Sequence, residues 1–90
     1  MNSEAKEDKT IIITVKLKGA LRACELAGEG CLGEGRWAVP KKTTIKDVID
    51  LLSLPIELAG IIFVNGQRVQ KDKILQEGEV IEFFPPIGGG

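Results

Sequence analysis

The sequence predicts an α+β domain in which one main helix packs on one face of a mixed β-sheet. Three observations lead to this prediction. Residues 10–18 alternate between apolar and polar side chains, which is typical of a half-buried strand. Residues 44–52 carry apolar side chains at helical spacing, and residues 80–84 alternate again. With 90 residues, the chain has room for one small domain.

The first predicted strand covers residues 10–18. Its inward face is wholly apolar and consists of Ile11, Ile13, Val15 and Leu17. Most of these side chains are β-branched, which suits a pleated surface packed on a core. Residues 1–9, which precede the strand, are polar and charged. We expect them to be a disordered lead rather than a signal peptide.

A Gly-rich insert, residues 19–35, follows the first strand. Residues 20–27 could form a short helix with Leu21 and Cys24 turned inward, and four glycines then break any regular pattern. The glycines lack the spacing of a phosphate-binding loop. We expect Cys24 and Cys31 to be small, partly buried side chains. Nothing marks the chain as secreted, which favours reduced thiols. A disulfide between the two cysteines is the alternative.

A short strand is predicted next, at residues 36–39, with Trp37 and Val39 on one side. Pro40 then ends the strand or marks a sheet edge. We expect Trp37 to pack in the core. The alternative is an exposed tryptophan that anchors a partner.

The main helix is predicted at residues 44–52. Thr44 and Asp47 have the spacing of a capping box, in which each side chain bonds the other residue's backbone N–H. We expect Pro55 to stop the helix. The apolar stripe of the helix is Ile45, Val48, Ile49 and Leu52.

The C-terminal part of the chain reads as three strands. Residues 61–64 and 67–70 flank Asn65-Gly66, a pair that favours a tight hairpin turn. The last strand is 80–84, with Ile81 and Phe83 on its inward face.

The predicted order is strand, insert, strand, helix and three more strands. This order leaves room for the first and last strands to pair in the middle of the sheet. That is the β-grasp, or ubiquitin-like, arrangement, with four to five strands. We expect it to occupy residues 10–87 and to end in a flexible tail at residues 88–90.

Composition excludes several function classes. The net charge of −1 gives no electrostatic footprint for nucleic acid or a membrane surface, and no apolar run approaches a membrane span. The chain has no histidine, which removes the commonest general base and a frequent metal ligand. We therefore expect no metal site and no independent enzyme activity. Since nothing marks the chain as secreted, we also expect a cytoplasmic protein.

The three terminal glycines are the most informative feature. They follow Pro85-Pro86-Ile87, and the reactive group that they present is the α-carboxylate of Gly90. Glycine has no side chain to pack, whereas proline restricts the direction in which the chain leaves the domain. Such a slim arm suits insertion into the narrow active site of another protein.

The chain resembles the MoaD/ThiS family of small sulfur-carrier proteins. Four features carry the resemblance: the opening strand at 11–15, the capped helix at 44–52, the turn Val64-Asn65-Gly66, and the ending from Glu77 to Gly90. The resemblance implies that a MoeB- or ThiF-like activating enzyme uses ATP to adenylate the carboxylate of Gly90. It further implies that a thiocarboxylate then forms, with Gly89 as part of the tail.

The resemblance also implies a sulfur-accepting synthase, MoaE-like or ThiG-like. A role as the small subunit of a molybdopterin-synthase-like complex is favoured, and thiamin thiazole synthesis is the alternative. No cofactor is expected on the chain itself, since ATP is used by the partner. Two other classes stay open: a ubiquitin-like modifier conjugated through Gly90, and a noncatalytic β-grasp binding module.

Partner docking is expected on the sheet face near the tail. Phe84 points away from the core there and either anchors the partner or packs under residues 19–35. Glu82, with Lys16 or Lys18, forms a polar rim or simply a solvated face. The residues expected to bind the partner are Phe84, Pro85, Pro86, Ile87 and Gly88.

Overall fold

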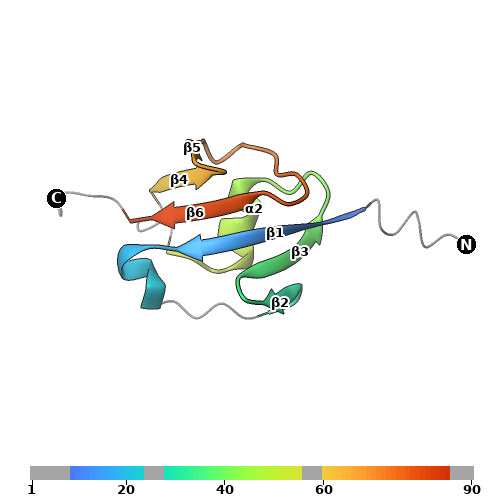
Figure 1. The fold of residues 1–90 in the computed structure, drawn as a ribbon, viewed down its shortest axis with the longest axis horizontal. Coiled ribbons are helices and arrows are strands. Elements are labelled where there is room, and N and C mark those ends of the chain that lie inside the picture. The colour runs from blue at the N-terminus through green and yellow to red at the C-terminus, as the bar shows by residue number, and fades with distance from the viewer. Residues whose placement is uncertain (1–8, 24–27, 56–59, 86–90) are drawn as a thin grey trace, which may run out of the picture.

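The computed structural model describes residues 9–23, 28–55 and 60–85. One sheet has the strand order β2-β3-β1-β6-β4-β5, and helix α2 covers one of its faces (Figure 1). The strands are β1 (Thr10–Leu17), β2 (Cys31–Gly33), β3 (Arg36–Pro40), β4 (Ile61–Val64), β5 (Gln67–Arg68) and β6 (Val80–Phe84). The helices are the 3₁₀ helix η1 (Gly19–Ala23) and the α-helix α2 (Ile45–Leu51).

The two central strands, β1 and β6, run parallel, with Thr14 opposite Val80 and Leu17 opposite Phe83. β3 lies antiparallel to β1, and β4 lies antiparallel to β6. A parallel pair needs a long crossover, which β3, α2 and β4 occupy here. The β-grasp prediction is therefore confirmed, including the pairing of the first and last strands. The C-terminal ends of both central strands lie at the same end of the sheet (Figure 1).

The sheet has six strands in the described residues, so the prediction of four to five was wrong. The unexpected strand is β2, which lies inside the segment predicted to be a Gly-rich loop and pairs with β3 at the sheet edge. All its residues are exposed, so no alternation of burial marks it in the sequence. Gly35, in the turn after β2, has φ +80°, and a Cβ there would lie 2.8 Å from the Val15 carbonyl oxygen. This glycine allows a close approach to β1.

The predicted short helix at 20–27 is described only in part, because residues 24–27 lie outside the described residues. Its first residues belong to the 3₁₀ helix η1, and Leu21 is fully buried there as expected. Cys24 lies outside the described residues. Cys31 is exposed because it sits on the edge strand β2, so the prediction of a partly buried side chain was wrong for this residue.

Helix α2 begins with the predicted capping box. The Thr44 hydroxyl accepts a hydrogen bond from the Asp47 N–H at 3.2 Å, and the Asp47 carboxylate accepts one from the Thr44 N–H at 3.0 Å. The helix buries the predicted stripe against the sheet. The buried residues of this stripe are Ile45, Val48, Ile49 and Leu52.

The helix ends before Pro55, so the prediction that this proline stops it was wrong. Ser53 has φ +54°, and its N–H donates to the Asp50 carbonyl at 3.1 Å. The N–H of Leu54 donates to the Ile49 carbonyl at 3.1 Å. These two bonds form a Schellman motif, which Leu54 completes by burying its side chain.

The capping box should make stability depend on pH. Hydrogen bonds from the Thr44 backbone and hydroxyl lower the pKa of Asp47, and Lys46 adds a smaller effect. A carboxyl with a lowered folded pKa stabilises the fold above its unfolded pKa and loses this contribution as pH falls through the folded value. Asp47→Asn is therefore expected to be less stable than wild type at neutral pH, with the difference shrinking below about pH 4.

Urea unfolding at a series of pH values measures this difference. Asp50→Asn is the control, because the Asp50 carboxylate only pairs with Lys46 at 3.5 Å on the exposed helix surface. A deficit of Asp47→Asn that stays constant from neutral to acid pH would contradict the capping explanation.

The predicted hairpin turn is confirmed at Asn65-Gly66. Both residues have positive φ, +51° and +85°, and Val64 pairs with Gln67 across a two-residue loop. The Asn65 side-chain oxygen also accepts a hydrogen bond from the Val80 N–H at 2.9 Å, which ties the turn to the start of β6. β5 is shorter than the predicted strand at 67–70.

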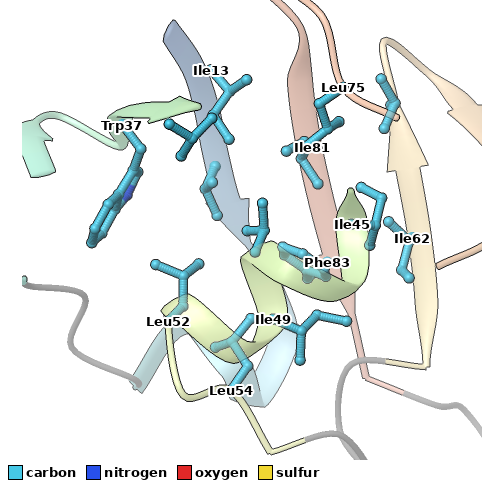
Figure 2. Packing of buried hydrophobic residues seen from close by; sticks show 14 of the residues in the cluster. Ile13, Trp37, Ile45, Ile49, Leu52, Leu54, Ile62, Leu75, Ile81 and Phe83 are labelled. Atoms are coloured by element: carbon cyan, nitrogen blue, oxygen red, sulfur yellow. The ribbon is translucent and has the colours of Figure 1, made fainter. Parts of the chain in front are cut away.

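The core lies between α2 and the inward face of the sheet (Figure 2). Ile81 and Phe83 from β6 are fully buried there, as predicted. Trp37 is 1% exposed, so its packing role is confirmed and the alternative of an exposed anchor was wrong. Within the described residues its indole N–H has no acceptor.

Candidate functional site

Strand β6 leads to the C-terminal tail and is therefore the base of the candidate site. Its residues alternate as predicted: Ile81 and Phe83 enter the core, whereas Val80, Glu82 and Phe84 lie on the face opposite α2. Because β6 is hydrogen-bonded to β1 on one side and β4 on the other, it ends in the middle of the sheet.

An aromatic pair lies on the open face of the sheet, beside the point where the tail begins. The Phe84 and Phe63 rings meet edge to face, with centroids 5.5 Å apart and planes at 74°. Both side chains are half-buried. Phe84 stands opposite Ile61 in the β6–β4 register. We call Ile61, Phe63, Phe84 and Pro85 the exit patch.

The exit patch lines a hollow of about 540 Å³ near the end of β6. Gly19 lines it from the start of η1, and Lys18 and Arg68 add cationic side chains to the lining. The hollow is open and mostly apolar, with two cations among its lining residues. This combination suits a protein surface that offers apolar side chains surrounded by polar or acidic groups.

An ion pair lies next to the exit patch. Lys18 Nζ lies 3.7 Å from a Glu82 carboxylate oxygen, with both side chains partly exposed. The sequence left Lys16 and Lys18 as alternative partners. Lys16 stands opposite Glu82 in the strand register, yet the pair forms with Lys18. An exposed pair of this kind contributes little stability, and its two charges offset each other.

The structure places two of the predicted partner-binding residues, Phe84 and Pro85. Phe84 packs on Phe63, and Gly19 of the 19–35 segment lines the same hollow. The other predicted site residues lie outside the described residues. They are Pro86, Ile87, Gly88, Gly89 and Gly90.

Sequence reasoning missed Phe63, Ile61 and Arg68. The signal was present: the Asn65-Gly66 turn fixes which residues face each other in the β4–β5 hairpin, so Phe63 pairs with Arg68. Alternation along β4 then puts Ile61 on the same open face. Gly19 carried no such signal, because its neighbour in space lies at the other end of the chain.

Two further hollows, of about 370 and 400 Å³, surround Lys41 and Lys42. The N–H of Lys41 bonds the Lys9 carbonyl, so these hollows lie at the start of β1, away from the exit patch. The described residues contain no group of three or more metal-ligating side chains. None of the helices in those ranges is long and apolar enough to cross a membrane.

Comparison with known proteins gives a family and a fold. A model of the ThiS family matches residues 21–90. No curated protein matches the sequence. A solved structure of similar fold is a chain in the protein–protein complex of subunits 1 and 2 of molybdopterin-converting factor from Helicobacter pylori 26695. The two chains share 21% identity with a TM-score of 0.54, over 89% of this chain and 100% of that chain.

Proposed function

The chain belongs to the ThiS family, and from this membership we propose that it is a sulfur carrier whose working group is the carboxylate of Gly90. The observation that carries the proposal is the family match itself, which continues through β6 and residues 86–90. Members of this family are small carrier proteins rather than enzymes. The activation chemistry is therefore assigned to a partner, and the chain supplies the terminal carboxylate that carries the sulfur.

The proposed chemistry makes a poor acyl donor reactive. A carboxylate oxygen of Gly90 attacks the α-phosphorus of ATP in the partner's active site, and pyrophosphate leaves. A sulfur nucleophile then attacks the carbonyl carbon of the mixed anhydride, and AMP leaves. Gly89 and Gly90 have no Cβ, so the carbonyl is uncrowded and the arm fits a channel shaped for bare backbone.

We assign docking of the activating enzyme to the exit patch. The patch combines a half-buried aromatic pair with an open, mostly apolar hollow, and it lies where β6 ends. Aromatic side chains in such pockets often dominate binding energy, while charged side chains at the rim set orientation. The start of the tail would then lie at the edge of the interface between the exit patch and this partner.

We favour a molybdopterin-synthase-like acceptor for the sulfur. The similar solved chain comes from a complex of two subunits of molybdopterin-converting factor, which supports a synthase-like partner for this chain. A thiazole synthase is the alternative acceptor within the family. If the tail instead forms isopeptide bonds with target lysines, the chain acts as a ubiquitin-like modifier.

Intact-mass measurement tests the proposal. The protein is incubated with a ThiF- or MoeB-like activating enzyme, ATP, a persulfide donor and a thiol reductant, which cleaves the acyl disulfide formed by the persulfide to the thiocarboxylate. We expect a mass increase equal to the exchange of one oxygen for sulfur, which fragmentation should place at Gly90. Omitting ATP should leave the mass unchanged. No mass change with an enzyme that converts another ThiS-family carrier in parallel would refute the proposal, and adducts on lysine would identify a modifier.

A further inference from the structure

Gly19 makes a direct contact with the first residue after β6. It has φ +57°, and a Cβ built there would lie 2.9 Å from Cγ and 3.1 Å from Cδ of Pro85. Real Cβ atoms are not found that close to another carbon, so any side chain at Gly19 must displace the proline ring or itself. The same construction at Gly33 meets nothing within 4 Å, although that residue also has a positive φ, +88°.

The backbone around Gly19 is fixed from both sides. The Lys18 N–H donates to the Phe83 carbonyl at 3.0 Å, which continues the β1–β6 pairing beyond the end of β1. The Leu21 N–H donates to the Lys18 carbonyl at 3.1 Å, and the Leu21 side chain is fully buried. Gly19 is therefore a rigid support, and Pro85 is the part that would yield.

We propose that Gly19 is a positioning residue for the tail: it seats the Pro85 ring and so sets the direction in which the reactive arm leaves the sheet. This inference rests on the proposed sulfur-carrier function. Proline has a fixed φ, so moving its ring turns the chain that follows. Small errors in the placement of a reacting group are costly, and a shift of about 1 Å can lower the rate about a hundredfold.

The structure separates this role from docking. Gly19 contributes only backbone to the lining of the hollow, whereas the apolar side chains of the exit patch come from β4, Phe84 and Pro85. A change at Gly19 should leave most of the docking surface intact. It should therefore lower the rate at which a docked carrier is adenylated more than the strength of docking.

Steady-state adenylation, followed by pyrophosphate release, tests the proposal. For Gly19→Ala we expect kcat to fall at least about tenfold and KM to change less than about twofold. Gly33→Ala is the matched control, because it imposes similar backbone strain without a contact, and it should change neither constant. Gly19→Asn provides a variant that should fold well, since asparagine tolerates this φ, and it should show the same loss.

A double-mutant cycle with Pro85→Ala gives the decisive comparison. Alanine lacks the ring atoms that Gly19 contacts, so adding Gly19→Ala to this background should lower kcat less than about twofold. An equal loss in both backgrounds, or a rise in KM with kcat unchanged, would overturn the positioning role. Wild-type protein that releases no pyrophosphate would instead overturn the proposed function, so the two failures are distinguishable.

Discussion

Removal of Gly89 and Gly90 together is expected to abolish adenylation by the activating enzyme while leaving the unfolding transition unchanged. The deletion shortens the arm by about 7 Å at full extension, because each residue spans about 3.5 Å. The remaining carboxylate then cannot reach the position where ATP reacts. Within the described residues, every residue of the buried core lies between Ile11 and Phe83, so we expect the fold not to depend on the deleted glycines.

A matched pair of substitutions tests the effect of side-chain bulk on the tail while the length of the tail stays constant. Gly90→Ala and Gly88→Ala make the same change in arms of the same length. We expect Gly90→Ala to lower kcat strongly, because its Cβ enters a channel shaped for bare backbone and crowds the carbonyl. Gly88→Ala should retain most of the activity, since this residue lies further from the reacting carbon.

Pyrophosphate release and intact mass report both experiments. Full activity in the truncated protein would place the working group elsewhere, and full activity in Gly90→Ala would show that the partner's channel is wide. Thermal unfolding of each variant, expected to match wild type, confirms that any loss arises from the tail.

Most of the fold could be predicted because burial leaves a periodic trace. The inward face of β1 and the stripe of α2 are apolar at spacings of two and of three to four residues, and both proved to be core. The Asn65-Gly66 turn was equally visible, because few residue pairs accept two positive φ angles. Where packing or backbone geometry restricts residue type, the restriction shows in the sequence.

The features that were missed leave no such trace. β2 is an exposed edge strand, so its residues are not selected by burial. The end of α2 depends on Ser53 in a conformation that usually takes glycine, so the sequence pointed to Pro55 instead. The contact of Gly19 with Pro85 joins opposite ends of the chain, and a single sequence holds no information on such a pairing.

Alanine substitutions of the two adjacent phenylalanines on β6 should have different effects, one on stability and the other on docking. The Phe83 side chain is fully buried in the core, with 0% exposed to solvent. It lies opposite Leu17 and Ile62 on the neighbouring strands. Phe83→Ala is expected to cost about 3–5 kcal/mol through lost burial and the cavity left behind. A domain of this size has little more stability than that, so the variant should melt far below wild type or be largely unfolded.

Phe84→Ala should leave the fold largely intact and weaken docking. Its half-buried ring contributes an edge-to-face contact with Phe63, worth about 0.5–1.5 kcal/mol, and the core is untouched. If Phe84 anchors the activating enzyme, its truncation should cost about 2 kcal/mol of binding, or roughly thirtyfold in Kd.

Thermal melts and calorimetric titration with the activating enzyme measure the two effects separately. Ile74→Ala is the control, because this side chain is 53% exposed and lines the hollow near Lys41 and Lys42, away from the exit patch. It should change neither stability nor affinity appreciably. If Phe84→Ala binds as tightly as Ile74→Ala, the partner docks elsewhere, and the open face of the sheet serves only to carry the arm. If instead the two phenylalanine variants lose stability equally, the division of β6 into a core face and a docking face is wrong.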